Sequence, residues 1–178
     1  MTTYKSLMLL RHAHSGAAKD PLGPDHERGL TTRGINACGQ MARWMAGKNV
    51  LPDAVLCSTA QRAQETWARI SAQLPHGDDI PVIDSRDLYL APPKILLRHI
   101  QSVPENITSI MCVAHNPGMA ELAFDLAARN PTTDISQMAM NYPTAALSVF
   151  QFDGPWTDID TAATTLKMFV VPKKLPTD

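Results

Sequence analysis

Two histidines in this chain, about a hundred residues apart, each follow a short apolar run. His12 comes after Leu7–Leu10 and Arg11, and His115 comes directly after Ile110–Ala114. If both runs are buried parallel strands, their carboxyl ends share one edge of a sheet, which is where α/β proteins place ligands. Two histidines and an arginine would then meet at one site. This combination suggests a phosphoryl group that is handled without a metal ion.

The chemistry of the Arg11-His12 pair depends on which ring nitrogen of His12 carries the proton. A neutral imidazole can attack phosphorus if its other nitrogen is fixed as a donor to a backbone carbonyl. The adjacent Arg11 guanidinium can hold phosphate oxygens in a fork. A lone histidine at a strand end is more commonly a structural hydrogen-bonding residue. The Arg11-His12 pair alone therefore does not decide between a nucleophilic and a structural histidine.

A further arginine, Arg62, stands at the start of a predicted helix. Ser58 or Thr59 can cap this helix, which places Arg62 in the first turn, where the helix dipole disfavours a cation by roughly 0.3–1 kcal/mol. Such violations are expected where function overrides stability, and Arg62 could reach over the strand end toward a bound anion. The alternative is a surface arginine paired with Glu65 or Asp53.

His115 is the third part of the pattern. Protonated beside a phosphate, its ring would donate a hydrogen bond and stabilise the charge on the phosphoryl oxygens in the transition state. The alternative is a packed histidine satisfied by the backbone. A zinc site made of His12, His14 and His115 is conceivable, but no carboxylate or cysteine completes a recognisable ligand pattern. We therefore expect neither a metal nor a cofactor.

Length and composition indicate one globular domain over residues 1–178, with 44% hydrophobic and 19% charged residues. The net charge of −1 and the absence of a Lys/Arg block argue against a nucleic-acid surface and leave any anion site small and local. The amino terminus is too weakly apolar for a signal peptide or a membrane span. Three cysteines, an odd number without metal or redox spacing, are expected to be reduced. These features predict a cytoplasmic protein with no membrane partner.

Apolar runs alternate with helical patterns along the chain. Strands are predicted at 7–10, 54–57, 81–84 and 110–114, with a long loop over 13–30. Helices are predicted from a cap at Thr31 or Thr32 to Gly47, over 63–74, from Pro92 to Pro104, and from Pro117, capped by Asn116, to Leu126. Two β-rich runs, 145–152 and 164–171, suggest antiparallel strands at a sheet edge. The pattern predicts a three-layer α/β/α sandwich with a mainly parallel central sheet.

Four motifs follow one another in order along nearly the whole chain. They are LLRHAHS at 9–15, DHERGLTTRG at 25–34, LCSTAQRAQET at 56–66 and AHNPG at 114–118, and they are followed by YPTAA at 142–146 and by Trp156. This set resembles the histidine phosphatase superfamily, and more narrowly its SixA-type phosphohistidine phosphatases. The resemblance implies a phosphoglycerate mutase-like fold and catalysis without a metal.

Carried over by position, the resemblance implies that His12 is the nucleophile and forms a phosphohistidine intermediate that water hydrolyses. Arg11, Arg62 and His115 would form the phosphate pocket with it.

Two departures from the family pattern matter for the reaction. His14 stands where the narrower group usually has a lysine, which adds a titratable group beside the nucleophile. The acidic proton donor of the larger family is also not clearly present. Whether Arg28 and Arg33 reach the substrate or only brace the loop stays open, although Arg33 breaks the same helix-dipole rule as Arg62.

The missing acid favours phosphohistidine as the substrate. An alkoxide leaving group needs strong general-acid help, whereas imidazole, with a pKa near 6.5, needs much less. Asp87 is the best-placed candidate for an acid, and a turn or capping aspartate is the alternative reading. The lack of an inserted cap between Asp84 and Ile110 suggests an open pocket that could admit a protein side chain.

The sequence therefore predicts a phosphohistidine phosphatase that acts on a phosphorylated histidine in a protein, for example a phosphotransfer domain of a signalling relay. One alternative is hydrolysis of small phosphomonoesters. Another is a protein that binds phosphate or phosphohistidine without cleaving it. A mutase would need a closing lid, which no segment clearly supplies.

Overall fold

A six-stranded sheet forms the middle of the computed structural model, which describes residues 4–16, 24–130, 135–136, 138, 141–160 and 162–175. Its strand order is β3-β2-β4-β1-β5-β6. The first four strands in this order are parallel, whereas β5 runs antiparallel to β1 and β6 antiparallel to β5. The strands are β1 (Tyr4–Arg11), β2 (Ala54–Ser58), β3 (Val82–Ser85), β4 (Ser109–Ala114), β5 (Leu147–Asp153) and β6 (Thr165–Val170).

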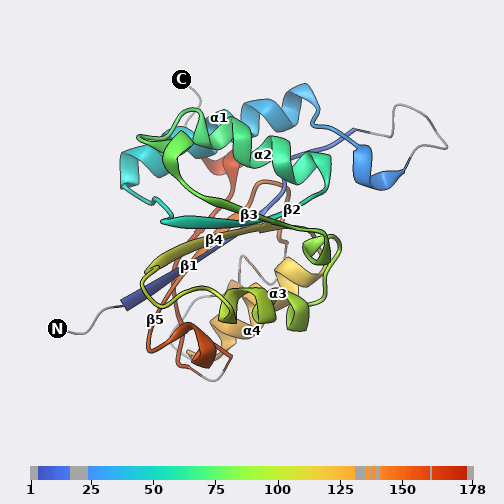
Figure 1. Ribbon diagram of the computed structural model, residues 1–178. Helices are drawn as coiled ribbons and strands as arrows, with labels where there is room; N and C mark the ends of the chain where they lie inside the picture. The colour runs from blue at the N-terminus through green and yellow to red at the C-terminus, as the bar shows by residue number, and fades with distance from the viewer. Residues whose placement is uncertain are drawn as a thin grey trace.

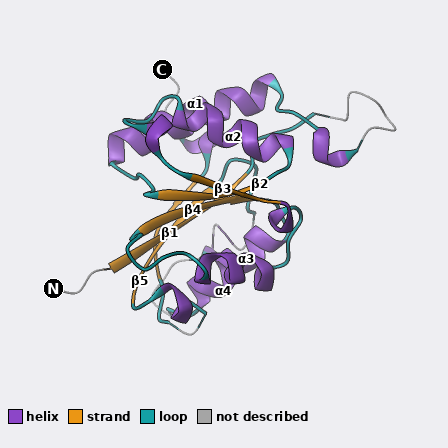
Figure 2. Ribbon diagram, in the orientation of Figure 1, coloured by secondary structure: helices purple, strands orange, loops and turns teal. Residues whose placement is uncertain are grey.

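Four α-helices of the described residues cover the two faces of the sheet, so that the molecule has three layers (Figures 1 and 2). One face carries α1 (Thr32–Lys48) and α2 (Gln61–Ser71), and the other carries α3 (Pro93–Gln101) and α4 (Gly118–Ala128). The predicted three-layer sandwich, with a mainly parallel sheet and antiparallel strands at one edge, is confirmed.

The strand β1 lies inside the sheet and packs on both faces. Leu7 and Leu9 are completely buried in the core beneath α3 and α4, while Met8 and Leu10 are buried beneath α1 and α2. This alternation follows from the two-residue period of a strand. With strand neighbours on either side and helices above and below, β1 is a rigid support for His12, the residue that follows it.

The end of α1 differs slightly from the prediction. The helix continues past Gly47 to Lys48 and is capped by Asn49, which has a left-handed conformation with φ of 53°. Asparagine is one of the few residues other than glycine that adopts this conformation readily, so it replaces the glycine cap. Residues 17–23 of the predicted loop lie outside the described residues.

The start of α4 corrects a second expectation. The helix begins at Gly118 rather than Pro117, and Asn116 does not cap it. Instead, Asn116 Nδ2 donates a hydrogen bond to the carbonyl of Tyr142 at 2.9 Å. A Cβ atom on Gly118 would lie 1.9 Å from the carbonyl oxygen of Ala91, so only glycine allows α4 to approach the residues before α3 so closely.

The three cysteines are buried and unpaired, with Cys38 in α1, Cys57 in β2 and Cys112 in β4. Burial raises the pKa of Cys38 to about 11 and that of Cys112 to about 12, and it also raises the pKa of Cys57. Their thiols are therefore protonated and unreactive at neutral pH. Cys57 and Cys112 thus lie in the strands that the sequence predicted at 54–57 and 110–114.

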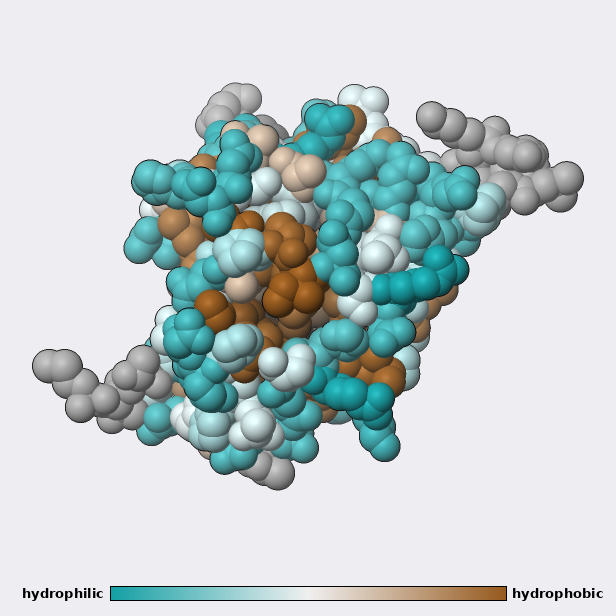
Figure 3. Space-filling view, viewed as in Figure 1, coloured by the Kyte–Doolittle hydropathy of each residue, from teal (hydrophilic) through white to brown (hydrophobic). Residues whose placement is uncertain are grey.

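Apolar residues gather near the centre of the surface in Figure 3, between the two layers of helices. The edge strand β3 contributes exposed apolar side chains, since Val82 and Ile83 are 40% and 48% exposed. Within the described residues, no helix has the length and apolar character needed to cross a membrane.

Candidate active site

The carboxyl ends of β1, β2 and β4 surround a cavity of about 410 Å³. Arg11 and His12 enter its lining from the end of β1, His115 from the end of β4, and Arg62 from the first turn of α2. Because β4 lies between β1 and β2 in a parallel arrangement, these ends meet at one edge of the sheet. The structure thus brings together four of the five residues that the sequence predicted for the site.

His12 is held with one ring nitrogen against the backbone and the other against an arginine. Its Nδ1 lies 2.7 Å from the carbonyl oxygen of Ala13, which can only accept, so Nδ1 carries the proton. Its Nε2 accepts a hydrogen bond from Arg62 Nε at 3.3 Å. Burial, followed by the charges of Arg62 and Arg11, lowers the pKa of His12 to about 4. At neutral pH the ring is therefore uncharged, with its lone pair on Nε2.

Arg62 is buried, with 1% of its surface exposed. Its Nη1 and Nη2 donate to the carbonyl and the carboxylate of Asp25 at 2.7 and 2.8 Å. The alternative of a surface arginine paired with Glu65 or Asp53 is wrong. Glu65 instead accepts from the backbone N–H of Leu30, and Asp53 accepts from the backbone of β4. The buried guanidinium is thus directed into the cavity rather than toward bulk water.

Thr66, in α2, connects Arg62 to the segment that carries His12. Its hydroxyl accepts from the N–H of Ala13 at 2.9 Å and donates to the carbonyl of Arg62 at 2.6 Å. Thr66 is completely buried, so water does not compete for either bond. The hydroxyl therefore fixes the position of the histidine relative to the arginine.

His115 lies beside His12, with the two ring centroids 5.0 Å apart. Its Nε2 is 2.8 Å from the hydroxyl of Ser58, while its buried Nδ1 has no hydrogen-bond partner among the described residues. Burial, followed by the neighbouring His12 and Arg62, lowers the pKa of His115 to about 3. A phosphoryl dianion in the cavity would act in the opposite direction, because an anion favours the protonated ring. His115 can therefore become a charged donor when the site is filled.

Arg11 is anchored on the segment before β5. Its Nη1 donates to the carbonyl of Tyr142 at 2.8 Å, and the same carbonyl accepts from Asn116. The Tyr142 hydroxyl donates to the carbonyl of Leu9 in β1 at 2.7 Å, so this residue is fixed at both ends. The Nε of Arg11 is buried without a partner among the described residues, which leaves a donor for an oxyanion.

Asp25, which sequence reasoning did not select as a site residue, also lines the cavity. Its carboxylate accepts from the hydroxyl of Tyr89 at 2.6 Å and forms ion pairs with Arg62 at 2.8 Å and Arg28 at 2.5 Å. The hydrogen bond from Tyr89, followed by that from Arg62, lowers the pKa of Asp25 to about 2. The position of Asp25 inside the motif at 25–34 was the one signal that could have indicated it.

The structure does not bring Asp87 to this cavity. It lies in a short 3-10 helix, Arg86–Leu88, and its side chain is 79% exposed. Its carboxylate is 3.9 Å from His99 Nε2, and its N–H donates to the hydroxyl of Ser85. These contacts agree with the alternative of a turn aspartate, and a role as the acid stays a prediction.

His14 lies at the rim of the cavity, with its Nδ1 2.8 Å from the hydroxyl of Thr31. A Cβ atom on Gly34 would lie 2.2 Å from the carbonyl oxygen of His14, so this glycine allows the start of α1 to pack against the His14 segment. Within the part of the chain that the structure describes, no three His, Cys, Asp or Glu side chains are grouped to hold a metal ion. The zinc alternative therefore has no matching ligand group there.

Comparisons with known proteins agree with this geometry. The model of the histidine phosphatase superfamily (branch 1) matches residues 7–88. The protein Rv1276c of Mycobacterium tuberculosis (strain ATCC 25618 / H37Rv) is 34% identical over 166 residues, which cover 92% of this chain and 100% of that protein. The chain belongs to the histidine phosphatase superfamily.

Within the superfamily, this histidine phosphatase is similar to the SixA type. Its structure matches a protein assigned as phosphohistidine phosphatase SixA from Nakamurella multipartitia with a TM-score of 0.83 and 25% identity, covering 95% of this chain and 96% of that chain. The structure of the protein histidine phosphatase SixA complexed with tungstate shares the fold, with a TM-score of 0.74, 22% identity and coverage of 94% and 97% of the two chains. The predicted SixA-type resemblance and the phosphoglycerate mutase-like fold are thus confirmed, and the comparisons support a phosphatase.

Proposed function

We propose that this histidine phosphatase hydrolyses phosphohistidine in a protein substrate through a phosphohistidine intermediate on His12. The observation that carries the proposal is the tautomer of His12. Its Nδ1 donates a hydrogen bond to the Ala13 carbonyl, and its Nε2 faces Arg62 in a cavity lined by several arginine side chains. A pKa of about 4 keeps this nitrogen unprotonated at neutral pH. The similar SixA structures, which are described as a phosphohistidine phosphatase and a protein histidine phosphatase, support the substrate class.

The reaction has two displacements at phosphorus. In the first, the Nε2 lone pair of His12 bonds to phosphorus and the P–N bond of the substrate breaks. The substrate imidazole already carries a proton on its other ring nitrogen, so it leaves as a neutral ring and needs no proton from the protein. In the second, water attacks the phosphorus of phospho-His12, phosphate is released and the neutral ring is restored. Arg11, Arg62 and protonated His115 donate to the equatorial oxygens throughout. Because these groups supply the positive charge, we propose that no metal ion is required.

The carboxylate that lines the cavity is a poor proton donor, and this favours cleavage of a P–N bond over cleavage of an ester. Asp25 is the carboxylate among the described residues that line the cavity, and its pKa of about 2 means that it has no proton to give at neutral pH. Imidazole can leave with little help, whereas an alkoxide cannot. Hydrolysis of phosphomonoesters is the second candidate function, and binding without cleavage is the third.

The proposal is tested by phosphate release from a phosphohistidine-bearing protein and from p-nitrophenyl phosphate, each with and without EDTA. We expect release from phosphohistidine, its loss in His12→Ala, its retention in a control variant of the exposed His76 (His76→Ala), and no effect of EDTA. Strong release from the ester alone would support the second candidate. Binding of phosphohistidine without release would support the third, and inhibition by EDTA would contradict the metal-independent mechanism.

We also propose that the enzyme works in the cytoplasm on a phosphotransfer domain. The three unpaired, buried cysteines support a reducing compartment. Between Asp84 and Ile110 the described chain forms only a short 3-10 helix and α3 and no inserted cap, which supports a protein substrate. Dephosphorylation of an isolated phosphotransfer domain by the purified enzyme is the direct measurement.

A further inference from the structure

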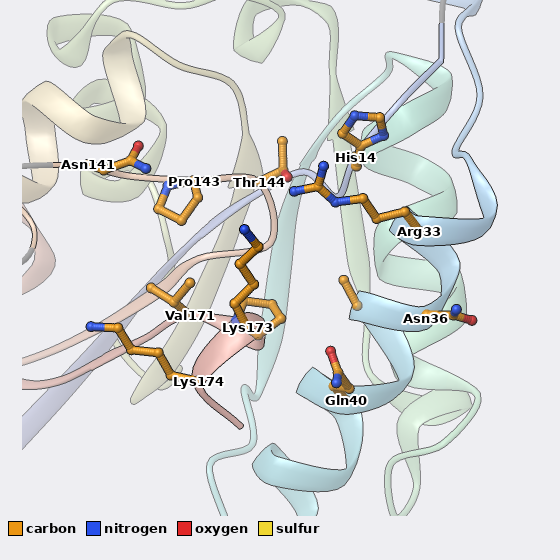
Figure 4. A pocket seen from close by; sticks show the side chains of 12 residues that line it. His14, Arg33, Asn36, Gln40, Asn141, Pro143, Thr144, Val171, Lys173 and Lys174 are labelled. Atoms are coloured by element: carbon orange, nitrogen blue, oxygen red, sulfur yellow. The ribbon is translucent and has the colours of Figure 1, made fainter. Parts of the chain in front are cut away.

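A second cavity, of about 460 Å³, lies next to the active site. It is enclosed by the first turns of α1 on one side and by the segment after β6 on the other (Figure 4). His14 and Thr144 line both cavities, so a molecule in the active site can extend into the second one. No step of the proposed reaction uses this space.

The side chains around the second cavity are cationic. Figure 4 shows Arg33 and Lys173 reaching into the cavity from opposite walls, with Thr144 between them. Neither side chain has an ion pair or hydrogen bond to any described residue, and the described residues that line the cavity include no aspartate or glutamate. Arg33 also stands in the first turn of α1, where the helix dipole opposes a cation and no acidic residue offsets it. Lys174 also lines the cavity, so the described lining carries three cationic side chains and no carboxylate, which favours an anion there.

The rest of the lining suits a peptide more than a free inorganic ion. Pro143, Val171 and Pro172 form an apolar wall. Three amide side chains also line the cavity, those of Asn36, Gln40 and Asn141. Amide groups can pair with a peptide backbone, and the apolar wall can cover aliphatic side-chain carbons. The volume is also larger than one carboxylate needs.

We propose that this cavity binds an acidic side chain, aspartate or glutamate, that lies close to the phosphohistidine in the protein substrate. Arg33 and Lys173 pair with that carboxylate while the phosphoryl group occupies the site of His12. The cavity is thus a specificity subsite that selects acidic sequences around the phosphohistidine. This assignment rests on the proposed function, because it takes the leaving group to be part of a polypeptide.

The test uses two phosphohistidine peptides that are identical except for glutamates or glutamines near the phosphohistidine. The readout is the ratio of kcat/KM for the acidic peptide to that for the neutral peptide, measured in each enzyme at low salt. Wild type is compared with Arg33→Gln/Lys173→Gln and with a matched control, Lys48→Gln/Lys94→Gln. Both control lysines are exposed and line neither cavity. Lys48 is on the same helix as Arg33 but about 22 Å further along it.

We expect wild type and control to prefer the acidic peptide by about 10-fold, since two exposed charge pairs contribute about threefold each. The preference should fall to about twofold or less in Arg33→Gln/Lys173→Gln, and it should weaken with salt in wild type. Both substituted side chains are exposed, and circular dichroism checks that the fold is retained.

Equal kcat/KM for the two peptides in wild type would overturn the subsite while leaving the proposed function intact. Turnover of neither peptide, with hydrolysis of p-nitrophenyl phosphate, would instead contradict the proposed function and the subsite with it. A further pair of substrates, carboxyphenyl phosphate and phenyl phosphate, separates the two sources of a carboxylate. A preference for carboxyphenyl phosphate that Arg33→Gln/Lys173→Gln abolishes, without any peptide preference, would overturn the peptide assignment in favour of a small anionic ester.

Discussion

Lowering the pH from 7 to 5 is expected to destabilise the folded protein by about 4 kcal/mol through two histidines. Burial lowers the pKa of His12 to about 4 and that of His115 to about 3, whereas both have a value near 6.5 in the unfolded chain. Below pH 6.5 the unfolded chain therefore binds protons that the folded protein does not, so the free energy of unfolding falls with pH. At about 1.4 kcal/mol per pH unit, the 1.5 units between 6.5 and 5 amount to about 2 kcal/mol for each histidine.

The measurement is urea unfolding at pH 7 and pH 5, followed by circular dichroism, for wild type, His12→Asn and His115→Asn. Each protein is compared with itself at the two pH values, so any change in packing cancels. The loss on acidification is expected to fall from about 4 to about 2 kcal/mol in either variant. Tyr142→Phe is the control, because it removes the hydrogen bond to Leu9 and lowers stability by about 1 kcal/mol at both pH values.

Two results would contradict this reasoning. If the loss stays at its wild-type size in both histidine variants, other groups cause the acid sensitivity. If wild type itself loses less than about 1 kcal/mol, the two histidines already carry protons in the folded protein at pH 5. At pH 5, His12 would then lack the free lone pair on which the proposed mechanism depends.

Three further substitutions test separate parts of the site. Asp25→Asn removes the carboxylate that competes with an oxyanion for Arg62, so tungstate should bind about fivefold more tightly by calorimetry; equal or weaker binding would argue against competition. Asp87→Asn should leave steady-state turnover of phosphohistidine and of esters unchanged, because the carboxylate is exposed. A loss of turnover of about 100-fold on esters alone would identify Asp87 as the acid. Thr66→Val leaves the Ala13 N–H without its partner and should lower the free energy of unfolding in urea by about 1–3 kcal/mol, whereas an unchanged value would mean that the bond is dispensable.

The grouping of Arg11, His12 and His115 could be predicted from the sequence. Residues that directly follow parallel strands all lie at the same edge of the sheet, so their place in the sequence gives their place in the fold. His12 and His115 each follow an apolar strand, and the register pairs Arg11 of β1 with Ala114 of β4. Two residues that directly follow paired positions on neighbouring parallel strands must lie close together. Arg62 could be predicted for a different reason, since a cation in the first turn of a helix needs an explanation.

Contacts made by loop residues cannot be predicted in this way, because loops have neither a strand end nor a helix turn to place their side chains. Asp25 reaches Arg62 and Tyr89, which are 37 and 64 positions away in sequence, through turns that have no periodicity. The prediction of Asp87 shows the same limit. Asp87 and Tyr89 follow the same strand only two residues apart, but the turn directs Asp87 toward His99 and Tyr89 toward the site. The conformation of this turn, which places Tyr89 beside Asp25 and leaves Asp87 exposed, has no signal in the sequence pattern.

The pairing of β1 also determines when the enzyme can become active during synthesis. Leu7 is opposite Ile110 in β4 and Phe150 in β5, so β1 is synthesised before either of its partners, which follow more than a hundred residues later. Contacts this distant slow folding, and the unpaired apolar strand is prone to aggregation until they form. A nascent chain that ends before Phe150 would display His12 on a strand without its second neighbour. Appearance of activity should therefore report the completion of folding, and early release of the chain should create a demand for chaperones.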